Sequence, residues 1–114
     1  MSIQAVILLP LMFSIMFLGM QGALYYHARS VAIAASQEGV RVSASEQPGN
    51  GPAAAADFVS AAGGEDVLRG VRITSDRSAT SVTVTVSGSS MSVFPGWDPQ
   101  VTQSASVPVE RLTR

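Results

Sequence analysis

An uncharged apolar run near the start of the chain constrains its fold more than any other feature. From Ile3 to Tyr26 the sequence reads IQAVILLPLMFSIMFLGMQGALYY, about 24 residues and, at 1.5 Å per residue, about 36 Å of helix. Its Leu, Ile, Val and Phe side chains together favour insertion by about 3–6 kcal/mol, which exceeds the penalties from Pro10, the glycines and two glutamines. The sequence therefore predicts one transmembrane helix.

The helical pattern continues past the apolar run, so we expect a transmembrane and extended helix over residues 1–44. On a wheel of 100° per residue, eight mostly small residues share one face, and small residues let two helices approach closely. This small-residue face meets either a helix of another subunit or the chain's own C-terminal domain. We predict the former and keep the latter as the alternative. The predicted helix–helix interface consists of Gln21, Leu24, Ala28, Val31, Ala32, Ala35, Gly39 and Val42.

The residues off this face are expected mostly on the wetter side of the helix. They are Arg29, Ser36, Gln37, Glu38 and Arg41. Leucine at Ala32 or Ala35 should then block association between chains, whereas leucine at Ser36 should have little effect.

A cleavable signal peptide is the main alternative for the first 36 residues, because AIAAS at residues 32–36 offers small residues to a signal peptidase. The apolar run is longer than a signal core of about 7–15 residues, and no basic region precedes it. We therefore predict a retained membrane anchor.

Composition excludes several functions for the remainder of the 114 residues. The seven basic residues are all Arg and are scattered, which argues against nucleic-acid binding. One His and no Cys argue against a zinc site. Because the single His27 sits at the end of the membrane span, no Ser/His/Asp arrangement can form within the soluble domain. The adjacent Glu65 and Asp66 fit a solvated turn better than an acid/base pair. We predict no enzyme activity, no cofactor and no small-molecule substrate.

The C-terminal part reads as a small α+β domain over residues 53–114, joined by a linker over residues 45–52. We expect a short helix from Ala53 to Ala62 that buries Phe58, Val59 and Ala62. Val82, Val84 and Val86 alternate with hydroxyl residues in a half-buried antiparallel strand at residues 81–88. Further strands are expected at residues 67–75, 91–94 and 101–109, giving a sheet of three to four strands. Phe94 and Trp97 are expected in the core rather than at an exposed contact.

The residues that follow the apolar run bear on orientation. Arg29 and a protonated His27 lie after the span, which by the positive-inside rule would place the domain in the cytoplasm. That rule counts several charges, and the β-rich, Ser/Thr-rich remainder is typical of an exported module. We therefore predict a single-pass plasma-membrane protein with an extracytoplasmic C-terminal domain. Tyr25, Tyr26, His27 and Arg29 would form its membrane-interface belt.

Residues 2–44 resemble the N-terminal segment of TadE-like proteins (TadE/TadG family), the minor pseudopilins of tight-adherence, Flp-type pilus systems. The matching features are an early Pro10, an aromatic pair before a basic residue, and the pattern A-x-x-x-G-x-R at Ala35, Gly39 and Arg41. The PGW turn at residues 95–97 and the ending SVPVERLTR are similar to actinobacterial members. At the position of the glutamate that pilins carry near their mature N-terminus, this chain has Gln4, which cannot neutralise an α-amino group. The family's processing site would lie before Met1.

The resemblance implies a pilin-like fold and a structural role in pilus assembly or a related secretion system. The implied partners are membrane lipid, other pilin-like subunits bound through the N-terminal helix, and the pilus assembly platform, with a possible place in a cell-surface pilus. The alternative is a single-pass accessory protein that presents a small binding domain without entering a filament.

Overall fold

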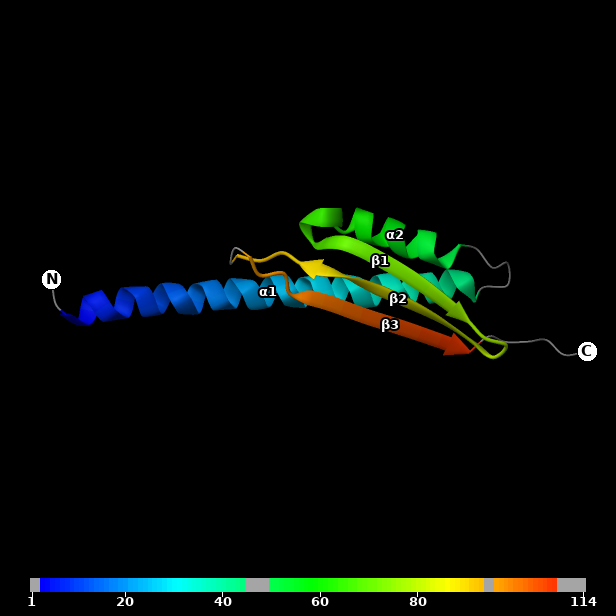
Figure 1. Ribbon diagram of the computed structural model, residues 1–114, viewed down its shortest axis with the longest axis horizontal. Coiled ribbons are helices and arrows are strands. Elements are labelled where there is room, and N and C mark those ends of the chain that lie inside the picture. The colour runs from blue at the N-terminus through cyan, green and yellow to red at the C-terminus, as the bar shows by residue number, and fades with distance from the viewer. Residues whose placement is uncertain (1–2, 45–49, 94–95, 109–114) are drawn as a thin grey trace, which may run out of the picture.

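The computed structural model describes residues 3–44, 50–93 and 96–108. Its elements are α1 (Ile3–Ser43), α2 (Gly51–Ala61), the 3-10 turn η1 (Gly64–Asp66), β1 (Leu68–Arg77), β2 (Ser81–Ser90) and β3 (Gln100–Pro108). The molecule is elongated, with principal extents of 81 × 20 × 19 Å, because one end of α1 extends far beyond the sheet (Figure 1). The predicted α+β arrangement of a long apolar helix, a short helix and an antiparallel sheet is confirmed.

The strands form an antiparallel sheet in the order β1-β2-β3. The order of the strands in the sheet is their order in the chain. β2 is therefore the central strand, and it pairs with β1 on one side and β3 on the other along its whole length. The predicted strand at 91–94 is wrong where it can be compared, because residues 91–93 lie outside the strands. They begin the connection from β2 to β3. The two ends of this connection are joined by a 2.9 Å hydrogen bond from the Ser90 amide to the Pro99 carbonyl.

A β-bulge in β1 explains why Arg69 and Arg72 break the expected alternation. Arg69 pairs with Ser89 and Arg72 with Ser87, so β1 has one residue more than β2 in this interval. Gly70 provides the positive φ of 58° at the bulge. The extra residue places both arginines opposite serines of the outer face, while later β1 residues regain the alternation.

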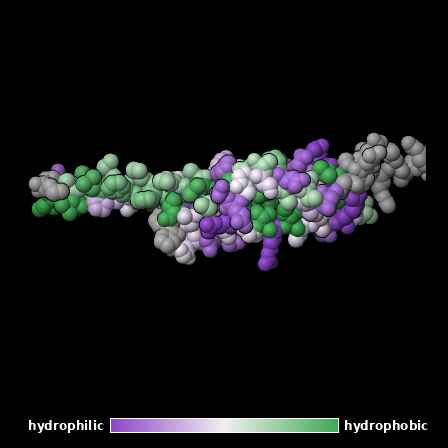
Figure 2. Space-filling model, turned by 90° about the horizontal axis from the view of Figure 1, so that it is seen from above, coloured by the Kyte–Doolittle hydropathy of each residue, from purple (hydrophilic) through white to green (hydrophobic). Residues whose placement is uncertain are grey.

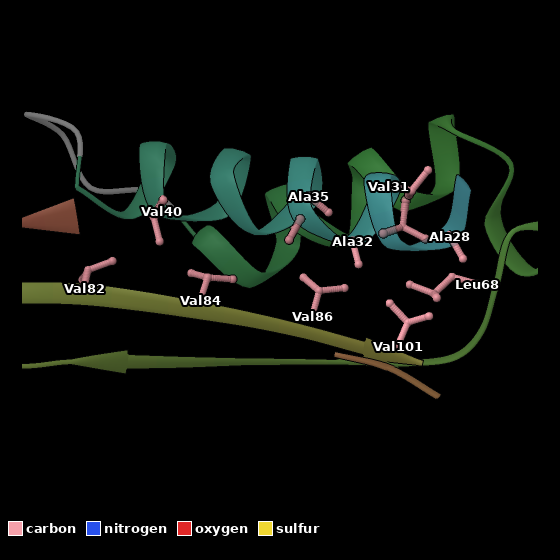
Figure 3. Close-up of a cluster of buried hydrophobic side chains, with 12 residues drawn as sticks. Ala28, Val31, Ala32, Ala35, Val40, Leu68, Val82, Val84, Val86 and Val101 are labelled. Carbon is pink, nitrogen blue, oxygen red and sulfur yellow. The ribbon is translucent and has the colours of Figure 1, made fainter. Parts of the chain in front are cut away.

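The two helices cover one face of the sheet, and the other face has no helix over it (Figure 1). α1 packs against β2, β3 and α2, whereas α2 packs mainly against α1 and β1. The predicted alternation in β2 is confirmed, since Val82, Val84 and Val86 are buried against the helices. Figure 3 shows these valines facing the alanines of α1. Burial of each valine stabilises the fold by about 1.5–3 kcal/mol.

α2 begins earlier and buries a different face than predicted. Asn50 caps the helix, and its side-chain oxygen accepts a 3.0 Å hydrogen bond from the Ala53 amide. Ala55 and Val59 are buried. The prediction that Phe58 lies on the buried side is wrong, because its side chain is exposed on α2. A helix shifted by a fraction of a turn exchanges its neighbouring buried and exposed positions.

Candidate membrane and assembly interface

The first half of α1, residues 3–20, is apolar and exposed to its surroundings. We call these residues the apolar half. Among the residues that the structure describes, α1 is the one helix long and apolar enough to cross a membrane. Figure 2 shows the hydrophobic surface gathered on this end of the molecule, while polar residues gather over the domain. An exposed apolar surface of this length is unfavourable in water and suits single-pass membrane anchoring.

One polar side chain of the apolar half is satisfied within the helix itself. The Ser14 hydroxyl donates a 2.8 Å hydrogen bond to the carbonyl oxygen of Pro10, four residues earlier. Such a bond removes the cost of an unpaired hydroxyl in hydrocarbon. Pro10 lies inside the helix, where its ring removes one backbone donor.

Gln21 marks the point where α1 enters the domain. Its Nε2 donates to the Met91 carbonyl at 3.2 Å, and its Oε1 accepts from the Val93 amide at 2.9 Å. The side chain is 4% exposed, so the domain rather than a membrane partner satisfies it. The domain therefore begins at Gln21, earlier than the predicted span to Tyr26 allows.

The small-residue face of α1 lies against the chain's own sheet and α2. Ala28, Ala32 and Ala35 are fully buried. In Figure 3, Ala32 and Ala35 face the β2 valines, and Ala28 lies beside Leu68. Leu24 and Val42 are partly exposed at its margins. The remaining buried members are Gln21, Val31 and Gly39. We call residues 21–43 the docked half of α1.

This placement is the intramolecular alternative stated from the sequence. A second helix could meet the same face only by displacing the sheet, so we do not retain that face as the contact between subunits. Leucine at Ala32 or Ala35 would disturb the fold itself. Ser36, expected toward water, is also fully buried, and its hydroxyl donates to the Ile33 carbonyl at 2.7 Å. It is therefore no neutral control position.

Two glycines bring α1 and α2 into backbone contact. A Cβ on Gly39 would lie 2.9 Å from Val84 Cγ1 and 3.1 Å from the Gly51 carbonyl oxygen. A Cβ on Gly51 would lie 1.8 Å from Ser43 Oγ and 2.7 Å from the Gly39 carbonyl oxygen. The close approach explains why small residues line this part of α1.

The predicted belt residues Tyr25, Tyr26, His27 and Arg29 are all exposed, on the first turns of the docked half. Gln4 is exposed in the first turn of α1. The belt thus lies beside the domain, at the end of the domain nearest the apolar half.

Trp97 joins this region from the connection between β2 and β3. The expectation that it lies in the core is wrong, because its side chain is 49% exposed; Phe94 lies outside the described residues. Trp97 lines a mostly apolar hollow of about 330 Å³ on the surface, the aromatic hollow, together with Leu18, Gln21, Gly22, Tyr25 and Pro99. Sequence reasoning missed this grouping because it depends on how the connection docks on α1.

The ion pair on the docked half faces water. Arg41 Nη2 lies 2.5 Å from Glu38 Oε1, and the hydrogen bond from Arg41 lowers the pKa of the Glu38 carboxyl below its ordinary value. A carboxylate whose pKa is lowered on folding adds stability above its unfolded pKa and loses it as pH falls through the folded one. An exposed pair of this kind adds little to stability.

The described residues 3–44, 50–93 and 96–108 contain no group of three or more His, Asp or Glu side chains that could hold a metal ion. The outer sheet face carries mainly hydroxyl residues, with Thr83 opposite Ser106 and Thr85 opposite Ser104. The hydroxyls of Thr83 and Ser106 hydrogen-bond to each other. The features that stand out on the molecule are therefore the apolar half and the region around Gln21.

Residues 1–41 match the family model of TadE-like proteins. The matched segment ends within α1, so it covers the apolar half and most of the docked half but none of the sheet. No curated protein and no solved structure matches the chain.

Proposed function

We propose that the chain is a TadE-like minor pilin, a structural component in the assembly of a tight-adherence pilus or related secretion system. The observation that carries the proposal is the division of α1 at Gln21. One half is fixed in a small domain, and the other is an apolar helix whose large side chains are exposed in the part of the chain that the structure describes. The family match falls on this same helix.

The division of α1 supports a specific mode of association. The apolar half, not the small-residue face, is the surface that meets the helices of other subunits. In the bilayer its side chains contact lipid, and in a filament they would contact neighbouring apolar helices. When the helix moves from the bilayer into a filament, it exchanges apolar contacts with lipid for apolar contacts with other helices. Van der Waals packing rather than the hydrophobic effect therefore decides association. Gly19 has no side chain, and a Cβ there would meet nothing within 4 Å. A helix of another subunit could therefore approach the backbone of α1 closely at this position.

The proposal includes an orientation in the plasma membrane, with the domain extracytoplasmic and the assembly platform and other pilin-like subunits as partners. Support comes from the sheet, whose outer face is lined with hydroxyl side chains and carries no large apolar patch in its described residues. A β-rich domain with such a Ser/Thr-rich surface is typical of an exported module, and this is the ground for placing it outside the cytoplasm. Protease added to intact spheroplasts should therefore remove an epitope placed at the C-terminus.

The test of function is the presence of the chain in purified filaments. Cells that carry the pilus system should be sheared, and the filament fraction probed for the chain. Recovery with the major subunit is expected for a minor pilin. Retention of all copies in the membrane fraction, with filaments still formed in a strain that lacks the gene, would contradict the proposal and favour a membrane accessory protein.

A further inference from the structure

The aromatic hollow lies where the apolar half meets the domain, and it is built from parts distant in sequence. Gln21 holds Met91 and Val93 by two hydrogen bonds, which fixes the β2–β3 connection against α1. Trp97 and Pro99, on the same connection, then line the hollow with Leu18 and Tyr25. Leu18 belongs to the apolar half, so the hollow continues the surface that faces lipid.

The length of the apolar half sets the depth of this hollow in a bilayer. Residues 3–20 are 18 residues of α1, about 27 Å of helix, which is close to the hydrocarbon thickness of about 30 Å. Gln21 would therefore lie at the edge of the hydrocarbon. The hollow, which extends from Leu18 to Tyr25 along the helix, would occupy the boundary between acyl chains and headgroups.

The exposed side chains around the hollow suit the boundary between acyl chains and headgroups better than they suit either pure hydrocarbon or bulk water. Trp97 is 49% exposed and Tyr25 38%, and both residue types are enriched where an apolar ring can meet lipid and its polar group can meet water. Asp98 and Gln100, which flank Pro99 in sequence, are exposed polar residues whose burial in hydrocarbon would be costly. Trp97 can thus reach lipid while its neighbours remain hydrated.

We propose that Trp97 is a second membrane-contact point, and that the aromatic hollow receives the glycerol-proximal part of a phospholipid acyl chain. The contact would seat the domain on the membrane surface at a fixed depth. The predicted belt of Tyr25, Tyr26, His27 and Arg29 lies on α1 alone, whereas Trp97 adds an anchor from the sheet end of the domain. The inference depends on membrane anchoring and does not require entry into a filament.

Trp97 is the one tryptophan in the sequence, which makes the chain its own probe. The full-length protein should be reconstituted in phosphatidylcholine vesicles containing lipids spin-labelled either near the glycerol backbone or near the terminal methyl group. We expect a blue-shifted emission relative to tryptophan in water, strong loss of intensity with the shallow label, weaker loss with the deep label, and protection from aqueous iodide.

Two matched single-tryptophan variants calibrate the depth. Phe13→Trp combined with Trp97→Phe places the probe within the apolar half, where the deep label should quench it most. Phe58→Trp combined with Trp97→Phe places it on the exposed side of α2, where only iodide should quench it.

Quenching of wild-type Trp97 by iodide as complete as that of the Phe58→Trp variant, with no quenching by either lipid label, would overturn the proposal. A blue-shifted emission insensitive to both lipid labels would overturn it equally, since another protein copy rather than lipid would then cover the ring. Because the vesicles contain no pilus components, either failure leaves the pilin proposal to its own test.

Discussion

Gly51 is a residue whose identity is set by one contact, the approach of α2 to the end of α1. A methyl group there would fall 1.8 Å from Ser43 Oγ and 2.7 Å from the Gly39 carbonyl oxygen. A side-chain hydroxyl can rotate away, but a backbone carbonyl cannot move without shifting the helix. The position therefore depends on glycine because of close packing.

Gly51→Ala should lower the free energy of unfolding by about 1–3 kcal/mol, because overpacking forces the two helices apart. Thermal unfolding in detergent, followed by circular dichroism, measures this change. Gly19→Ala is the matched control, since its added Cβ meets nothing within 4 Å and alanine favours a helix interior over glycine, so it should not lower the midpoint. Equal midpoints for the two variants would show that α1 and α2 are not in backbone contact.

Sequence patterns predicted buried and exposed positions well where the period of a helix or strand alone determines them. The alternation of Val82, Val84 and Val86 follows from strand geometry alone, and these side chains are buried as expected. The wheel also placed Ala28, Ala32 and Ala35 on one face, and all three are buried, but it put the buried Ser36 off that face. A wheel identifies a shared face and not what covers that face. Phe58 was misplaced because adjacent helix positions differ by 100°, so small errors in rotation exchange them.

At the scale of elements, one side chain of α1 makes two hydrogen bonds to the β2–β3 connection. Gln21 satisfies the Met91 carbonyl and the Val93 amide, two backbone groups that would otherwise need water or another partner. The sequence offered no signal for this contact, because a glutamine in an apolar helix is equally compatible with a partner helix. The contact joins residues 72 positions apart, and such pairing depends on the completed fold.

Gln21→Leu should lower the free energy of unfolding by about 1–3 kcal/mol, because both backbone groups lose their partner while remaining partly buried. Amide exchange at Val93, measured by NMR in detergent micelles, should accelerate. Gln4→Leu makes the same chemical change at an exposed position in the first turn of α1 and should alter neither quantity. Unchanged protection of Val93 in Gln21→Leu would mean that the connection is fixed by other contacts.

At the scale of the whole molecule, α1 has two environments along one continuous helix. The docked half forms the core with the sheet and α2, and the apolar half extends beyond the domain with its side chains exposed (Figure 1). The fold class and the long apolar helix could be predicted from sequence, because they follow from length and hydrophobic period. The boundary at Gln21 could not, since it is set by where the sheet ends against the helix.

The most direct test of this division is a cysteine scan of α1 in cells that assemble the pilus, which is practical because the chain has no native cysteine. Single cysteines at Leu9, Phe13 and Met16 sample the apolar half, and Ala32→Cys and Ala35→Cys sample the small-residue face. Our account predicts oxidative crosslinks between subunits from the apolar half, and none from Ala32 or Ala35, whose thiols should react with maleimide only after unfolding. Efficient crosslinks at Ala32 and Ala35, with none from the apolar half, would contradict it.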